Sequence, residues 1–95
     1  MKFGYTIIYV PDVSASLAFF EKAFGFTKRF LDELGYYGEL NTGETTIAFA
    51  SHSIGEMNLP DGYVAASSSQ KPLGVELAFI TPSVAEAHAK AVEAG

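Results

Sequence analysis

Cysteine is absent from this 95-residue chain, and its absence removes several kinds of site at once. Without thiols there is no disulfide framework, no thiolate metal site and no cysteine nucleophile. Basic residues are also few, because six Lys and Arg stand against eleven Asp and Glu and give a formal net charge of −5. The basic residues are scattered along the chain, whereas nucleic-acid binding needs them clustered. We therefore expect no nucleic-acid partner.

Long apolar runs are missing as well. No run approaches the ~20 residues of a membrane span, and the N-terminus carries one Lys and then a strand pattern in place of a long apolar signal segment. These absences predict a cytoplasmic protein with no membrane partner. The chain also shows no nucleophile elbow, no Walker-type loop and no dinucleotide fingerprint, so no catalytic residue and no cofactor is assigned.

Apolar and aromatic residues are plentiful by contrast. The apolar fraction is 48%, with eight Phe and five Tyr, which is enough for the modest core of one small globular domain. The two ends of the chain also match: at a shift of 71 positions, 9–13 falls on 80–84. Each segment reads as a short strand, a Pro, a helix-capping residue, a Val and an Ala-rich helix. Such a match indicates a repeated supersecondary unit.

The first copy begins with a strand over Phe3–Val10, where apolar, aromatic and β-branched residues follow one another. Asp12 is a suitable N-cap for the helix that follows, and Gly25 is suited to end it. One stripe of this helix is apolar at helical spacing. Its members are Val13, Leu17, Phe20 and Phe24. Three further strands are expected at 26–33, 36–41 and 45–51, with a two-residue turn at Thr42-Gly43 between the last two.

An irregular linker is expected over His52–Leu73, where Gly, Ser and Pro recur and where we predict the most mobile part of the chain. Gly74–Thr81 then reads as a fifth strand, and Ser83 with Glu86 forms a capping box for a second helix. We expect the inward stripe of this helix to comprise Val84, Ala87, His88, Ala91 and Val92. The predicted fold class is α+β: a βαβββ module at 1–51, a linker at 52–73 and an incomplete βα second module at 74–95.

This order of elements resembles the vicinal oxygen chelate superfamily, which includes glyoxalase I, extradiol dioxygenases and bleomycin- and fosfomycin-resistance proteins. The segments that carry the resemblance are Ile8–Val13, Ser16–Phe26, Gly43–Ala50 and Gly74–Phe79. The resemblance implies paired βαβββ modules whose sheets curve around a cavity. It also implies, for the enzymes of the group, a divalent metal held by one His or Glu on the first and last strand of each module.

Most of those metal-binding positions carry a side chain that is a poor metal ligand or none. The resemblance places the first on Tyr5, the second at or next to Ala48 and the third on Glu76, while the fourth would lie beyond Gly95. A phenol is a poor ligand for such a cation at neutral pH, and alanine is none. We therefore expect no metal.

The sequence favours non-metal binding of a small apolar or aromatic molecule over catalysis. Tyr5, Ile7 and Tyr9 share one face of the first strand by their spacing of two. The expected ligand-binding residues are Tyr5, Ile7, Tyr9, Ala48, Glu76 and Ala78. Two alternatives stay open: a metal-dependent lyase, isomerase or dioxygenase of the same superfamily, and a truncated product with no intact site.

The expected partner is a second copy of the chain. Gly74–Thr81 and the second helix have apolar surfaces that one module cannot cover, and an unpaired strand edge is an association site. A homodimer, formed by edge pairing or by exchange of the 74–95 segment, would supply the missing surface.

Overall fold

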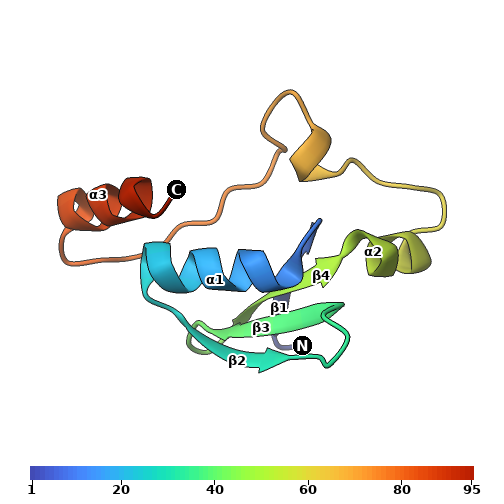
Figure 1. Cartoon of the computed structure of the whole chain (residues 1–95), viewed down its shortest axis with the longest axis horizontal. Coiled ribbons are helices and arrows are strands. Elements are labelled where there is room, and N and C mark those ends of the chain that lie inside the picture. The colour runs from blue at the N-terminus through green and yellow to red at the C-terminus, as the bar shows by residue number, and fades with distance from the viewer.

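The computed structural model describes all 95 residues and contains one four-stranded sheet with helices. The strands are β1 (Tyr5–Val10), β2 (Thr27–Leu31), β3 (Tyr37–Asn41) and β4 (Thr46–Ser51). Their order across the sheet is β1-β4-β3-β2 (Figure 1). β1 is parallel to β4, and the other neighbours are antiparallel. The predicted α+β class and the βαβββ order of the first module are confirmed.

The helix α1 (Val13–Phe24) covers one face of the sheet (Figure 1). Its cap is as predicted, because Asp12 Oδ1 accepts a hydrogen bond from the Ala15 N–H at 2.9 Å and Gly25 ends the helix at φ 77°. Val13 and Leu17 are buried and form the core with Leu40 and Phe49. The other two members of the predicted stripe are less covered: Phe20 is half-buried and Phe24 is 38% exposed.

Two turns connect the antiparallel strands. The Asp32 carboxylate accepts hydrogen bonds from the Leu34 and Tyr36 N–H groups after β2, and these bonds hold the pKa of Asp32 below its usual value. The β3–β4 connection spans 42–45, four residues rather than the predicted two. Thr42 closes it, since its hydroxyl donates to the Thr45 carbonyl and accepts from the Ile47 N–H. A side chain therefore replaces the backbone pairing that a tighter turn would need.

The region predicted as an irregular linker contains a helix, α2 (His52–Asn58), and a short 3-10 turn, η1 (Ala66–Ser68). The prediction missed α2 because its sequence has no apolar periodicity. The Ser51 hydroxyl caps this helix by accepting from the Ile54 N–H at 3.4 Å. α2 contacts β1 and β4, and it therefore directs the chain past one end of the sheet.

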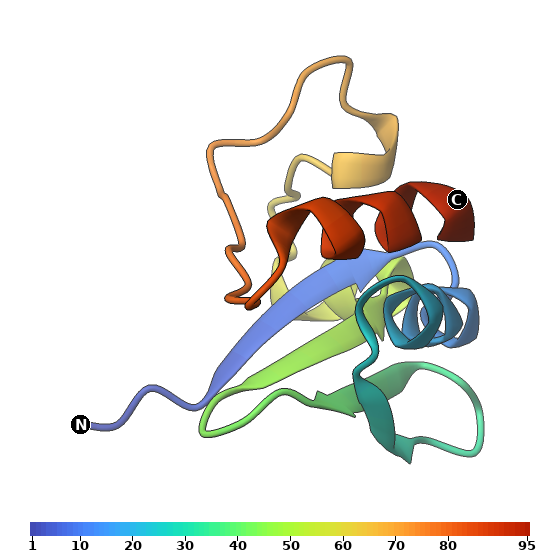
Figure 2. The ribbon, with the colours of Figure 1, turned by 90° about the vertical axis from the view of Figure 1, so that its left-hand side faces the viewer.

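The predicted fifth strand is wrong, because no residue of 74–81 pairs with the sheet. Figure 2 shows this segment (orange) running from η1 to α3 without joining β1. A strand exists only through a partner, and this segment is instead held by Phe79, whose ring centroid lies 5.0 Å from those of Phe24 and Phe26. The outer edge of β1 has no neighbouring strand.

The last helix, α3 (Val84–Ala94), packs against α1 rather than on the sheet. Ser83 caps it as predicted, by accepting from the Glu86 N–H. The predicted inward stripe is only half right: Ala87 and Ala91 are half-buried, whereas the other three members are exposed. These three are Val84, His88 and Val92. Small side chains face α1 because they let the two helices approach closely. None of the helices is both long and apolar enough to cross a membrane.

Candidate functional site

The sheet face opposite α1 carries most of the predicted site residues, and we refer to it as the open face. The register of the strands determines which side chains lie on this face. Ile7 of β1 and Glu39 of β3 both pair with Ala48 of β4. Tyr9 and Tyr37 likewise both pair with Ala50. Because paired residues point to the same face, large side chains of β1 and β3 flank the small ones of β4.

The exposed part of the open face is apolar and aromatic along β1. Tyr5 is 50% exposed and Ile7 is 48% exposed, whereas Ala48 is fully buried. Ala48 therefore forms the floor between its larger neighbours and does not itself reach the surface. The structure thus brings together Tyr5, Ile7 and Tyr9 with Ala48 beneath them, as the alternation of β1 predicts.

Glu76 and Ala78 do not join this group. Both lie on the segment that fails to form a strand, and both are exposed. Glu76 makes no hydrogen bond and no ion pair. Their inclusion in the site follows from the resemblance and from a cavity shared with a second copy of the chain, and it stays a prediction.

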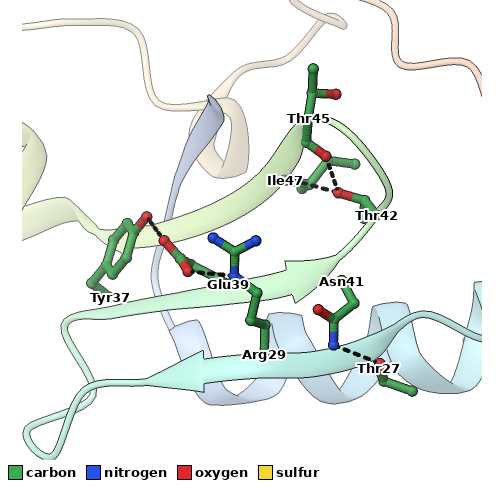
Figure 3. A network of polar contacts seen from close by, with 8 residues as sticks. All are labelled: Thr27, Arg29, Tyr37, Glu39, Asn41, Thr42, Thr45 and Ile47. Atoms are coloured by element: carbon green, nitrogen blue, oxygen red, sulfur yellow. Dashed lines mark hydrogen bonds and ion pairs between the residues drawn. The ribbon is translucent and has the colours of Figure 1, made fainter. Parts of the chain in front are cut away.

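A polar cluster of Arg29, Tyr37 and Glu39 lies on the open face and was not foreseen (Figure 3). The Tyr37 hydroxyl donates to Glu39 Oε2 at 2.7 Å, and Arg29 Nε donates to Glu39 Oε1 at 3.1 Å. The Glu39 side chain is only 13% exposed. A carboxylate at this depth is stabilised by such charge-assisted hydrogen bonds, and here each of its oxygens has one.

Tyr37 stays a neutral donor well into alkaline conditions. Burial raises the pKa of its phenol, and the hydrogen bond to the Glu39 carboxylate and that group's negative charge raise it further. The nearby Arg29 charge opposes these effects without cancelling them. Tyr37 therefore keeps its phenol proton throughout the physiological range.

A β-bulge turns Arg29 toward this cluster. Lys28 pairs with Leu40 and Phe30 pairs with Glu39, so Arg29 is an extra residue in β2. A bulge places two residues opposite one and can re-aim a side chain. Arg29 reaches Glu39, and the Phe30 ring lies 6.3 Å from that of Tyr37. The alternation Tyr37-Gly38-Glu39 could have indicated the acidic group from sequence, but the bulge has no comparable local signal.

A second group closes one end of the open face. The Tyr63 ring lies 5.1 Å from the Tyr9 ring, and its hydroxyl is 2.6 Å from His52 Nδ1. His52 Nε2 is 3.2 Å from the Ser67 hydroxyl. Tyr63 also packs directly on Gly55, where a Cβ would come within 2.6 Å of the Tyr63 hydroxyl oxygen and 2.9 Å of its ring. His52 and Tyr63 therefore fasten the 59–68 region to α2 and β1.

Two hollows lie on the helix side. One of about 460 Å³ lies between α1 and β1, around Val10, Phe19 and Phe20. Its main polar group, Asp12, already caps α1. The other, of about 630 Å³, lies between the end of α1 and the start of α3. Neither contains a polar cluster comparable to that of the open face, and we treat both as gaps in helix packing.

Comparison with known proteins places this geometry in a family. The sequence model of the Glyoxalase/Bleomycin resistance protein/Dioxygenase superfamily matches residues 2–95. The chain belongs to this superfamily. None of the proteins with curated descriptions matches it.

Several solved structures share the fold. A family enzyme from Burkholderia phytofirmans PsJN is 26% identical, with a TM-score of 0.75 over 97% of this chain and 72% of its own. A gene product from Arabidopsis thaliana is 24% identical, with a TM-score of 0.72 over 100% of this chain and 72% of its own. A hypothetical protein from S. aureus is 19% identical, with a TM-score of 0.75 over 100% and 70%.

The divalent metal of the superfamily's enzymes does not fit the residues present. Of the three positions that the resemblance indicates within the chain, Tyr5 offers a phenol, Ala48 is buried without a donor and Glu76 lies outside the sheet. No three His, Asp or Glu side chains lie together in a group that could hold an ion. Glu39 comes nearest in chemistry, but both of its oxygens are engaged by Arg29 and Tyr37.

Proposed function

We propose that this member of the superfamily binds a small apolar or aromatic molecule on its open face without a metal. The observation that carries the proposal is the pair of half-exposed side chains, Tyr5 and Ile7, on the one sheet face that α1 leaves free. Ligand sites combine such apolar surface with a few placed polar groups. Arg29, Tyr37 and Glu39 are the polar groups here, while Tyr9 and Tyr63 close one end.

A second copy of the chain completes the site in this proposal. The open face of one chain has no opposite wall, and the outer edge of β1 is unpaired. Pairing at that edge would place the open faces of two chains next to each other. This arrangement is supported by the exposed apolar side chains that follow in the 74–81 segment, among them Val75 and Ile80.

The test uses naphthamide, a neutral aromatic probe, followed by amide NMR. We expect its addition to shift resonances of β1, β3 and β4. Ile7→Ser should weaken binding roughly fivefold, because a half-exposed side chain contributes about 1 kcal/mol, half of the value for full burial. Val92→Ser is the matched control, since Val92 is also an exposed apolar residue but lies on α3.

Two results would contradict the proposal. One is a set of shifts confined to α1 and α3, which would place the probe in a hollow on the helix side. The other is equal binding by the Ile7→Ser and Val92→Ser variants, which would show that the open face contributes nothing specific.

A further inference from the structure

Arg29 uses only a small part of its hydrogen-bonding capacity. Its single polar contact joins Nε to Glu39 Oε1 at 3.1 Å. Its side chain is 42% exposed, whereas that of Glu39 is 13% exposed. A guanidinium has five N–H donors, so four remain free on the two terminal nitrogens. Figure 3 shows these two nitrogens at the end of the Arg29 side chain, beyond the Nε that contacts Glu39.

Glu39 and Tyr37 hold the guanidinium in place. Glu39 Oε2 accepts from the Tyr37 hydroxyl at 2.7 Å while Oε1 accepts from Arg29, so the carboxylate cannot rotate without losing both bonds. The bulge in β2 fixes the backbone from which Arg29 extends. The free end of the guanidinium is therefore a preorganised pair of parallel donors, which is the geometry that matches the two oxygens of a carboxylate.

Apolar surface surrounds this donor pair. Phe30, the neighbour of Arg29 in the bulge, is 49% exposed, and its ring lies 6.3 Å from that of Tyr37. Across the sheet, Ile7 and Glu39 flank the same residue, Ala48. A ligand lying across β4 would thus meet Ile7 with its apolar body and Arg29 with its end.

We propose that Arg29 is the anion subsite of the open face, and that the ligand is an apolar or aromatic monocarboxylate. This inference rests on the proposed function and specifies the ligand class for the same site. Tyr37 and Glu39 are positioning residues, because they act on the ligand only through Arg29.

Long-range attraction contributes little to this selection. Glu39 neutralises the charge of Arg29 locally, and the chain as a whole carries −5. The preference for a carboxylate must come from the two parallel hydrogen bonds at short range. Because exposed ion pairs are weak, we expect a preference of about fivefold to tenfold rather than several hundredfold.

The experiment compares naphthoate with naphthamide, which have nearly the same shape but differ in charge. The native chain should bind naphthoate about fivefold to tenfold more tightly in an NMR titration. Arg29→Gln should abolish that preference, because naphthoate loses its charged partner and the two probes then bind alike. Arg29→Lys should restore part of it, because the charge returns without the paired donors.

Lys28→Gln is the matched control, because Lys28 precedes Arg29 in β2 but pairs with Leu40, whose side chain belongs to the core beneath α1. This variant should keep the full preference for naphthoate. The Arg29 side-chain N–H resonances should also move on addition of naphthoate to the native chain.

The outcomes separate this inference from the proposed function. If both probes bind at the open face with equal affinity, the anion subsite is refuted and the binding function stands. If Arg29→Gln weakens both probes equally, Arg29 supports the fold and recognises no anion. If neither probe binds, both proposals fail together.

Discussion

Gly38 lies where α1 packs closely on β3. A Cβ at this position would come within 2.6 Å of a Leu17 methyl carbon, 3.2 Å of a Val13 methyl carbon and 3.2 Å of the Phe30 carbonyl oxygen. Val13 and Leu17 are both buried, so neither has free space into which to move. A single missing methyl group thus sets the distance between the helix and the sheet that carries the open face.

We predict that Gly38→Ala lowers the free energy of unfolding by about 1–3 kcal/mol, the usual cost of overpacking a core. Gly4→Ala is the control, because nothing lies within 4 Å of its added methyl group. It should change stability by less than about 0.5 kcal/mol. Urea unfolding followed by circular dichroism measures both, and equal midpoints for the two variants would refute this account of the packing.

At the scale of elements, the chain follows its local signals wherever an element can form from them alone. α1 has an N-cap, an apolar stripe and a terminal glycine, and all three are present in the structure. The first four strands also appear close to their predicted ranges, because apolar runs between turn residues leave little choice of conformation.

Two elements differ from the prediction because contacts outside the element decide whether it forms. Gly74–Thr81 has an apolar strand pattern but pairs with nothing, and Phe79 anchors it to the rings at the end of α1 instead. α2 has no apolar pattern, yet it forms, because Ser51 caps it and Tyr63 packs on Gly55. The course of 74–81 is decided by residues far away in sequence, whereas α2 depends on the serine that precedes it and on Tyr63 shortly after it.

The residues of the candidate site also differ in whether the sequence alone could place them. Tyr5, Ile7 and Tyr9 could be placed on one face from their alternation alone, because a strand puts every second side chain on the same side. Arg29 could not, since its position depends on a bulge in the pairing of β2 with β3. Glu76 stays a prediction, because the resemblance places it in a cavity shared between two chains and within one chain it lies on the unpaired 74–81 segment.

Tyr63 holds the long connection between α2 and α3 against the sheet. Its ring contacts Tyr9 and its hydroxyl meets His52, while Val64 beside it is 66% exposed. We predict that a protease of broad specificity cuts the native chain first within 65–71. Tyr63→Ala should speed that cut roughly tenfold, because cleavage follows the population of the open form.

Val64→Ala provides the control and should leave the cleavage rate nearly unchanged. Two results would count against this description of the connection. First cuts within β1 or β4 would show that the sheet opens before the connection does. Equal rates for the Tyr63→Ala and Val64→Ala chains would show that Tyr63 fastens nothing.

At the scale of the whole molecule, a single chain has a larger accessible surface and a larger radius of gyration than is usual for its size. Its accessible surface is 7064 Å², against about 5,300 Å² for a compact monomer of 10.2 kDa. Its radius of gyration is 14.0 Å, whereas about 12.4 Å is usual for this length. The excess surface of roughly 1,700 Å² is about twice what each partner buries in a standard interface.

Part of this excess is apolar. Phe3 is 66% exposed just before β1, and Val75 and Ile80 are 76% and 103% exposed in the segment that remains unpaired. An open edge with apolar side chains beside it favours association with an identical chain. We therefore predict a symmetric dimer, whose two open faces share one binding site.

Light scattering over a dilution series at micromolar concentrations should give twice the mass of the chain. Val75→Glu and Ile80→Glu should each raise the dimer dissociation constant at least about tenfold, because each would bury an unpaired carboxylate in the interface. Leu34→Glu should not, since Leu34 is 77% exposed in the turn between β2 and β3, beyond the opposite edge of the sheet. A mass of one chain at every dilution, together with a single cooperative unfolding transition, would refute the dimer. In that case the naphthamide titration would show whether the open face of one chain binds its ligand without a second wall.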